Sequence, residues 1–567
     1  MDTKMKRRDF LKISALAGVA VVAAACAPTA TPTAAPTAVP KATTAATKAA
    51  TAVPKATEVP KATAAPTKVG FQGEIEFYAQ TYTPTSESPN PDPKAPKREA
   101  MAVLAKEWAA LHPGVKFTFY KVPVGIDYNA WLNTQLIGGT GPDIFWLHLY
   151  NVTPNLNEYA DEGKVVPLND YLELPNKYTP EDKTAWKNTF KSPFQTCFST
   201  KGQWGGVPLD LVSTGVYCNV DMFKSVGIDL TKEIGPELGS PKNWDTMISW
   251  CKKFKEAGLY AFSMGGYLLR MWLQAVLGDQ LFWNLTPPFD KLNYHEQTPK
   301  AFQEGMISQE EVIMQYACNN WKAFAEPATR TEFEIFKDLS QYMPVGFVSP
   351  EENFGGAYEL FLQNKLAMFW DGSWSVGPIM QDERRKFEFS SFWLPPLTKA
   401  TTPLAHDPPI LPIGVGGYGS ITYGIHRKCI AKGNVDECVE WLMYITTPKN
   451  DEMIVNEVPS FIPSNKKAKS LPEVENLFVG ETRLVAGAGH PWPIPWKWFS
   501  YQETKYADTF ARELTLYLLG DQDLDKFMAN ADVAAQEAVP SIIRAAAIQY
   551  SKDGSWDLTR WTCQPTV

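Results

Sequence analysis

The residues best suited to hold a ligand lie in AMFWDGSW, residues 367–374, where Trp370 and Trp374 stand on either side of Asp371 and a glycine. Large aromatic side chains usually pack in a core, but a ring beside a carboxylate can also stack on a ligand while the carboxylate bonds to its edge. Trp370 ends the apolar run AMFW, which favours a core position. For Trp374 both positions stay open at this point.

Patterns that would indicate catalysis or a cofactor fail on their context. GVGGYG, residues 414–419, fits G-x-G-x-x-G, but SITYGI follows it and alternates like a strand, whereas a dinucleotide-binding loop opens a helix. The six histidines lack metal-ligand spacing, and no G-x-S-x-G elbow, phosphate loop or C-x-x-C pair occurs. We therefore expect no cofactor and no metal. The two carboxylates of a glycosidase need only meet in space, so that reaction stays open.

A β-α-β-α-β series is predicted at the start of the globular part. Three strands are indicated by EIEFYA, VKFTFYKV and PDIFWLHL, and apolar residues recur at helical spacing in residues 98–114 and 129–139. This order is typical of a mainly parallel sheet covered by helices, in which ligands bind beyond the carboxyl ends of the strands.

The residues that follow these strands are therefore candidates for ligand contact. Gln80 and Tyr82 fall at the mouth of the first strand, and Trp146 and His148 fall at the end of the third. Trp146 can equally be a packing residue of the core.

The first 26 residues are predicted to be an export signal. A basic stretch, MDTKMKRRDFLK, precedes an apolar run that is too short to span a bilayer. Arg7 and Arg8 lie in RRDFLK, which resembles the twin-arginine motif of proteins exported in the folded state. The run ends in AAAC, which resembles a bacterial lipobox, so Cys26 would carry the lipid of a membrane-anchored lipoprotein. Cleavage after an Ala-x-Ala site is the alternative.

Residues 27–70 are predicted to be a disordered tether. Residues 27–69 consist almost only of Ala, Pro, Thr, Val and Lys, contain VPKAT three times and have no aromatic residue. Such a composition cannot bury a core, and a Pro-rich chain extends by about 3 Å per residue. The tether could therefore hold a folded domain up to on the order of 100 Å from a membrane.

The rest of the chain has the composition of a globular protein, and its length exceeds the usual size of one core, so two lobes are expected. The net charge is -8 and no basic stripe occurs outside the leader and tether, which argues against a nucleic-acid partner. No later apolar run approaches membrane-spanning length, so membrane contact is expected only through the N-terminus. Cys429 and Cys438 flank a short turn and could form a disulfide or remain buried thiols.

A series of segments, in order, resembles the extracellular solute-binding proteins of ABC importers, in the family 1 group that includes maltose-binding protein. The resemblance runs from about Gly73 to Tyr550. The segments that carry it are LAKEWAALHPGVKF, GGTGPDIFW, DEGKVVPLNDYL, GGVPLDLVSTGVYCNVDMFKSVGID, PKNWDTM, ELFLQNKLAMFWDGSW, FWLPPL, GVGGYG, ECVEWLMYITTPKNDEMIV and FIPSNKKA.

The resemblance implies an α/β protein with the two-lobed periplasmic-binding-protein fold, in which crossing hinge segments let the lobes close on a solute. The glycines of GVGGYG would lie at a crossing, where backbone freedom suits hinge motion or a close approach. The implied boundaries are 71–209 and 414–458 for lobe I, 210–413 and 459–550 for lobe II, and 551–567 for a C-terminal tail.

The resemblance also places aromatic rings in the cleft between the lobes. Sugars suit such clefts because their C–H faces lie flat on rings while their hydroxyls bond to carboxylates and amides. Trp374 and Trp146 would stack on the solute, and Asp210 and Asp371 would bond to its edge. Weaker candidates for extending the cleft are Tyr267, Trp272, Trp496 and Trp498. The predicted contacts are Gln80, Tyr82, Trp146, His148, Asp210, Asp371, Trp374 and Tyr418.

These features predict a receptor and not an enzyme. It would be a monomeric lipoprotein outside the cytoplasmic membrane, at the cell surface or in the periplasm, that captures an oligosaccharide and delivers it to the membrane subunits of an ABC permease. Leu149 stands where maltose binders place an acid, which argues against maltose itself. The alternatives are an extracellular glycoside hydrolase and a receptor of the same fold for another solute.

Overall fold

The structure is a computed structural model, and the residues that it describes lie after residue 69. The predicted export signal, the tether up to residue 69 and the C-terminal tail lie outside the described residues. Described are residues 70–88, 97–147, 156–191, 203–235, 239–264, 267–283, 309–344, 346–347, 356–416, 421–480, 483–485, 495, 498–499 and 504–550.

The first sheet has five strands in the order β2-β1-β3-β11-β4. β1 is parallel to β2 and to β3, whereas β11 is antiparallel to β3 and to β4. Because α2 and α3 connect the first three strands, the predicted β-α-β-α-β series is confirmed. The bounds are β1 Gly73–Phe77, α2 Ala100–Leu111, β2 Val115–Phe119, α3 Tyr128–Gly138, β3 Ile144–Trp146, β4 Val207–Pro208 and β11 Thr422–Ile425.

Local sequence explains where α2 and α3 lie. α2 buries one face around Trp108 and ends just before Pro113, which cannot continue its hydrogen bonding. α3 begins after Asp127, whose side chain accepts a hydrogen bond from the backbone N–H of Ala130 at 3.0 Å. It ends at Gly139, which has the left-handed φ of 66° typical of a helix C-terminus.

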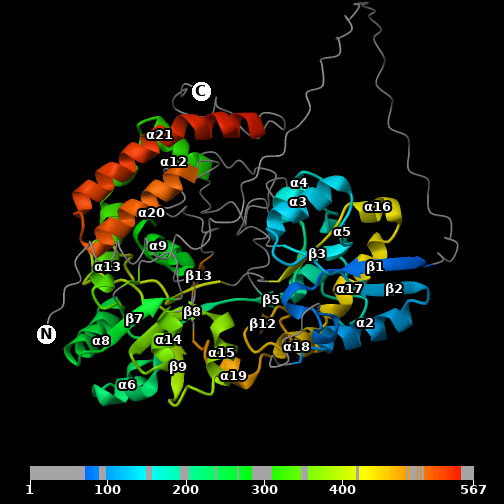
Figure 1. Cartoon of the computed structure of the whole chain (residues 1–567), viewed down its shortest axis with the longest axis horizontal. Helices are drawn as coiled ribbons and strands as arrows, with labels where there is room; N and C mark the ends of the chain where they lie inside the picture. The colour runs from blue at the N-terminus through cyan, green and yellow to red at the C-terminus, as the bar shows by residue number, and fades with distance from the viewer. Residues whose placement is uncertain are drawn as a thin grey trace, which may run out of the picture. The chain divides into compact units, whose positions relative to one another are not determined.

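Helices from a distant part of the sequence complete the first core. α17 and α18 contact α2, and Figure 1 shows these yellow and orange elements beside the blue β1, β2 and α2. Trp441 of α17 packs against Phe77 and Trp108 with edge-to-face geometry. The remaining elements of this region are η1 Gln80–Tyr82, η2 Thr85–Glu87, α4 Leu156–Asp161, α5 Asn169–Leu172, η3 Trp186–Thr189, α16 Lys428–Lys432, α17 Val435–Ile445 and α18 Pro448–Asn456.

The second sheet has four strands in the order β7-β8-β6-β9, with bounds β6 Thr214–Asn219, β7 Tyr260–Met264, β8 Leu366–Gly372 and β9 Phe389–Phe392. β7 is parallel to β8, but β6 is antiparallel to β8 and to β9. Three strands of this sheet therefore run in one direction and β6 runs against them. In the first sheet, β11 is likewise the one strand that runs against the others. Both β11 and β6 are the strands by which the chain enters their sheet from the other lobe.

Helices cover the second sheet and form the largest hydrophobic core, whose buried members include Trp244, Phe333 and Trp370. Most of this core comes from residues between the two crossings, and α20 and α21 add to it from the C-terminal part of the chain. The elements are α6 Val220–Ser225, α7 Leu230–Glu233, α8 Trp244–Glu256, α9 Tyr267–Leu281, α12 Gln309–Ala317, η5 Ala323–Ala325, α13 Pro327–Ser340, α14 Gly356–Leu362, η6 Ser373–Ser375, α15 Val376–Gln381, α19 Pro472–Glu475, α20 Thr504–Leu519 and α21 Leu524–Tyr550.

Two short pairs of strands lie where the chain crosses between the sheets. β5 (Asp210–Leu211) pairs antiparallel with β12 (Ile462–Pro463), and β10 (Ile413–Val415) pairs parallel with β13 (Arg483–Val485). A Cβ at Gly416 would lie only 2.2 Å from the carbonyl oxygen of Val212. Glycine is required there because two crossing segments approach each other closely.

Candidate functional site

An aromatic cluster lies at the carboxyl ends of the parallel strands β1, β2 and β3. Tyr78 follows β1, Tyr120 follows β2, Trp146 ends β3, and α3 supplies Tyr128 and Trp131. The ring of Tyr128 is 5.3 Å from Tyr78, 5.8 Å from Trp131 and 5.2 Å from Trp146, and the Trp131 ring is 6.0 Å from Tyr120. Trp146 is half-buried and packs against the first hydrophobic core.

A pocket of about 370 Å³ opens beside this cluster, and Gln80 lines it together with the three tyrosines. Gln80 is one of the few non-glycine residues with a left-handed backbone, at φ 53°. Charged residues stand at the same pocket, where Glu87 and Lys121 form an ion pair at 3.8 Å. The full lining consists of Tyr78, Gln80, Thr83, Glu87, Ser88, Arg98, Tyr120, Lys121, Val122, Pro123, Ile126 and Tyr128.

The tyrosine hydroxyls of this pocket stay protonated at neutral pH. Burial raises the pKa of Tyr78 and of Tyr120, and it raises that of Tyr128 much further. The Tyr128 hydroxyl donates to the carbonyl oxygen of Trp146 and so fixes the end of β3. Neutral hydroxyls, an amide and ring faces are groups that bind a polar, uncharged solute.

Trp374 stands in η6, directly after β8, and contacts the hydrophobic cores of both lobes. A Cβ at Gly372 would lie 2.2 Å from the Trp374 ring, so the glycine between the two tryptophans lets that ring fold back over the backbone. Trp370, in contrast, is fully buried within β8, and its predicted core position is confirmed. The two tryptophans of AMFWDGSW therefore have different environments.

Trp272 of α9 meets Trp374 edge to face, with ring centroids 6.0 Å apart. Trp272, which was predicted to extend the cleft, therefore lies beside Trp374, which was predicted to stack on the solute. Its buried indole N–H has no hydrogen-bond partner within the described part of the chain. Such a donor can be satisfied by a ligand.

Asp371 does not present its carboxylate to solvent, in contrast to its expected role at the edge of a ligand. It is 1 % exposed and accepts hydrogen bonds from the backbone N–H of Gly372, at 2.8 Å, and from the hydroxyl of Ser375. Burial raises its pKa to about 7, although these hydrogen bonds and the nearby Trp374 indole oppose the shift. Asp371 therefore holds the segment that carries Trp374.

Asp210 and Tyr82 form a buried pair instead of two separate ligand contacts. The Tyr82 hydroxyl donates to Oδ2 of Asp210 at 2.8 Å, and the backbone N–H of Ile421 donates to Oδ1 at 2.9 Å. Asp210 has no exposed surface, and Tyr82 has 3 %. Both oxygens of the Asp210 carboxylate are thus engaged by the protein. The carboxylate joins the segment after β1 to the two crossing segments.

Several predicted site residues fall outside the described residues, namely His148, Tyr418 and Trp496, as do the lipidation site Cys26 and the arginines Arg7 and Arg8. The side chain of Tyr267 is also not described. Trp498 is fully buried against Trp321 and Phe282, so its candidacy for the cleft is wrong.

Four further residues of the site were not predicted from the sequence: Tyr78, Tyr120, Tyr128 and Trp131. Tyr78 and Tyr120 directly follow β1 and β2, so the rule that ligands bind at carboxyl strand ends could have identified both of them. Tyr128 and Trp131 carry no such signal, because they lie in the first turn of α3 and join the cluster only through packing.

Among the described residues, no group of His, Cys, Asp or Glu is arranged to hold a metal ion, and no helix is long and apolar enough to cross a membrane. Cys429 and Cys438 are free, buried thiols. The site consists of aromatic rings, hydroxyls and an amide from strand ends and from α3, with charged side chains at the same pocket.

Two α/β lobes, linked by paired crossing segments and bearing aromatic rings at strand ends, define a two-lobed solute-binding protein. The family model for bacterial extracellular solute-binding proteins matches residues 91–450, which is more than half of the chain. This protein belongs to that family, whose members bind solutes outside the cytoplasm. Among proteins of curated function, none matches the chain.

Solved structures show the same fold at low sequence identity. RafE of Streptococcus pneumoniae in its apo form is 16% identical, with a TM-score of 0.51, 82% of this chain covered and 98% of that chain. The ABC substrate-binding protein Lmo0181 of Listeria monocytogenes, in complex with cycloalternan, is 15% identical with the same TM-score and coverage. A probable secreted solute-binding lipoprotein of Streptomyces coelicolor is 14% identical, also at 0.51 and with the same coverage.

Proposed function

We propose that this protein is the receptor of an ABC importer, that it binds an oligosaccharide between its two lobes, and that it does not turn the sugar over. The observation that carries the proposal is the aromatic cluster at the ends of β1, β2 and β3, beside a pocket lined by tyrosine hydroxyls and an amide. Sugar rings stack on such faces and hydrogen bond at such edges. The complex of Lmo0181 with cycloalternan shows that this fold accommodates a saccharide.

The residues proposed to face the solute are Gln80 and Trp146 from the first lobe and Trp374 from the second. His148 and Tyr418 remain predicted contacts. Tyr82, Asp210 and Asp371 support the site from within, because their polar groups bond to the protein. The lobe boundaries given above remain a prediction; the two main cores draw on residues 75–209 with 421–461 and on residues 216–415 with 498–543.

The protein is further proposed to be exported through the Arg7–Arg8 signal and anchored by a lipid on Cys26, with ABC permease subunits as its partners. Cys318 is disulfide-bonded, which is typical of proteins outside the cytosol. In cells, Cys26→Ala should release the protein from the membrane fraction or leave the precursor uncleaved. Mature, membrane-bound Cys26→Ala protein would contradict the anchor.

The function is tested by a thermal-shift screen of the purified protein against raffinose, maltotriose and chitotriose, followed by product analysis. A sugar that binds only the native state raises the melting temperature, by a free energy of about 2.7 kcal/mol at a hundred times Kd. We expect a shift with at least one oligosaccharide and no hydrolysis. Product formation that a carboxylate substitution abolishes would establish the hydrolase instead, and a shift only with non-sugar solutes would change the cargo.

A further inference from the structure

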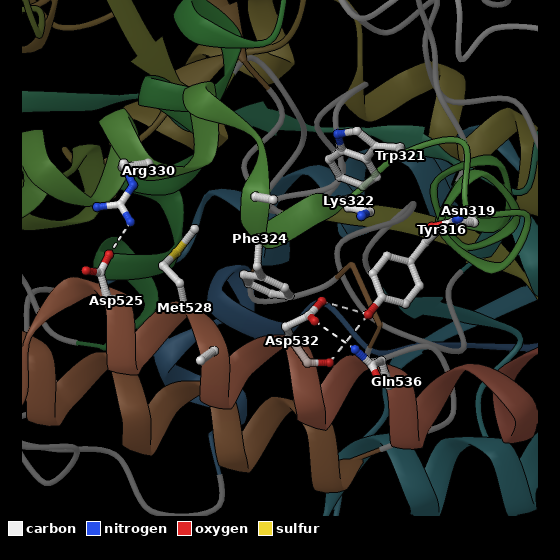
Figure 2. A pocket seen from close by; sticks show the side chains of 12 residues that line it. Tyr316, Asn319, Trp321, Lys322, Phe324, Arg330, Asp525, Met528, Asp532 and Gln536 are labelled. Carbon is white, nitrogen blue, oxygen red and sulfur yellow. Dashed lines mark hydrogen bonds and ion pairs between the residues drawn. The ribbon is translucent and has the colours of Figure 1, made fainter.

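A second pocket, of about 740 Å³, lies on the second lobe and shares no residue with the predicted ligand contacts. It is formed by the end of α12, the turn that follows, η5, the start of α13 and one face of α21 (Figure 2). Its lining consists of Tyr316, Asn319, Trp321, Lys322, Phe324, Ala325, Arg330, Asp525, Met528, Ala529, Asp532 and Gln536.

The floor of this pocket is apolar and well packed. Trp321 and Phe324 are each 7 % exposed and Met528 is 4 % exposed. Their side chains are therefore held by packing, and only a small part of each faces the pocket. The indole N–H of Trp321 already donates to Glu326 at 3.2 Å, which leaves only its carbon surface for a ligand. A rigid apolar floor suits the C–H face of a sugar ring.

Polar groups stand at both ends of this floor, as Figure 2 shows. At one end Asp532 accepts hydrogen bonds from the hydroxyl of Tyr316 and from the amide of Gln536, each at 2.7 Å. At the other end Arg330 forms an ion pair with Asp525. The two hydrogen bonds to Asp532 hold its carboxylate and the Gln536 amide in position, which lowers the entropic cost of binding a hydroxyl-rich ligand.

The charges of the lining favour a neutral ligand. Arg330 is neutralised by Asp525, and the other two charged side chains of the lining, Lys322 and Asp532, have opposite signs, so the lining carries no net charge that would select an anion. A cationic ligand would meet Lys322, an exposed side chain that forms no ion pair within the described ranges. Asn319 adds an exposed amide at the rim. Hydroxyls, which both donate and accept, can satisfy the carboxylate and the amides together.

We propose that this pocket is a second carbohydrate-binding site, which takes one or two neutral sugar units outside the cleft between the lobes. Its volume lies within the range of ordinary ligand pockets, about 300–1,000 Å³. A second site on the same chain would raise the effective concentration of a long saccharide near the first.

The test is isothermal titration of the full-length protein with raffinose, maltotriose and chitotriose. Ala529→Trp fills the pocket from an exposed position of α21, and Val533→Trp, on an exposed position of the same helix outside the lining, is the matched control. Trp374→Ala removes a proposed cleft contact in a separate variant. We expect a second binding event that persists in Trp374→Ala and Val533→Trp, and that Ala529→Trp weakens at least tenfold.

Each other outcome is decisive. A single binding event that Trp374→Ala weakens and Ala529→Trp leaves unchanged would overturn the second site and leave the proposed function standing. A single event that only Ala529→Trp weakens would support the pocket and overturn the cleft. Absence of saccharide binding, combined with failure of Ala529→Trp alone to support uptake in cells, would make the pocket a contact of the transporter and overturn the proposal.

Discussion

The Tyr82 hydroxyl donates to the carboxylate of Asp210 at 2.8 Å, and these two buried residues lie 128 positions apart in the sequence. Asp210 begins β5, in one crossing segment, and its other oxygen accepts from Ile421, which follows the return crossing. One carboxylate therefore ties both crossings to the segment after β1. Burial and the neighbouring carboxylate raise the pKa of Tyr82 well above its usual value, so it acts as a donor at every physiological pH.

Tyr82→Phe should destabilise the protein by about 1–3 kcal/mol, because it leaves one oxygen of a buried carboxylate without its donor. The free energy of unfolding from urea denaturation measures this. Tyr260→Phe is the control, since Tyr260 is 39 % exposed and its hydroxyl forms no hydrogen bond within the described residues. Equal stability of the two variants would show that the Tyr82–Asp210 bond is dispensable.

The two tryptophans of AMFWDGSW should respond in opposite ways to truncation. Trp370→Ala should cost roughly 3–5 kcal/mol of folding stability, because the ring is fully buried in β8 and its loss leaves a cavity. Trp374→Ala should instead cost about 2 kcal/mol or more of sugar binding, as a buried aromatic anchor does. Its stability should also fall, by less than that of Trp370→Ala, because half-buried Trp374 contacts both cores.

Chemical denaturation and calorimetric titration of both variants separate the two effects. If Trp374→Ala binds every ligand of the parent equally well, its ring is structural. If Trp370→Ala folds normally and loses binding, the roles of the two rings are reversed.

The part of the fold that could be predicted is the part governed by local pattern. Helix α2 follows from the spacing of residues such as Trp108, and strands β1 to β3 follow from alternation and composition. The orientation of β6 could not be predicted, because it depends on how the chain crosses between lobes. The crossing also explains Gly416, whose role in a close backbone approach depends on Val212, some two hundred residues earlier.

The same distinction applies to the site. Gln80 lies at the mouth of β1 as predicted, because it stands shortly after a recognisable strand that ends at Phe77. The burial of Asp210 and Asp371 could not be predicted from the sequence. The partners of Asp210 become its neighbours only on folding. Asp371 accepts from the next residue along the chain, and that hydrogen bond depends on the local backbone geometry. Trp272 meets Trp374 from about a hundred residues away, and no local pattern indicates such a contact.

Asp371 should make stability depend on pH in a defined window. Its folded-state pKa is raised to about 7, so the folded protein holds a proton that the unfolded chain loses near pH 4. Its contribution to stability is therefore present below about pH 4 and is lost as the pH rises toward 7, by up to about 1.4 kcal/mol per pH unit. Asp371→Asn should remove this slope, measured as the difference in unfolding free energy between variant and parent.

Ser375→Ala provides a second check of the same carboxyl group. The Ser375 hydroxyl donates to Asp371 and favours its charged form, so its loss should raise the pKa further and extend the sloping region to higher pH. A parent and an Asp371→Asn variant with parallel pH profiles would show that Asp371 is charged in the folded protein throughout.

Glu332 should be a site where removal of an acid stabilises the protein. It lies on the buried face of α13 with no exposed surface, and neither carboxyl oxygen has a hydrogen-bond partner in the described part of the chain. Burial raises its pKa well above the usual value, so its contribution to stability is lost as the pH rises above the unfolded-state value of about 4.3. Glu332→Leu should therefore stabilise the fold by about 1–3 kcal/mol, and by more at pH 8 than at pH 5, because a buried polar group without a partner is replaced by an apolar one.

Glu334→Leu, on the same helix with an exposed side chain, should change stability little. Urea denaturation of the three proteins at both pH values measures the difference, and a loss of stability in Glu332→Leu would show that this carboxyl group serves the folded protein in another way.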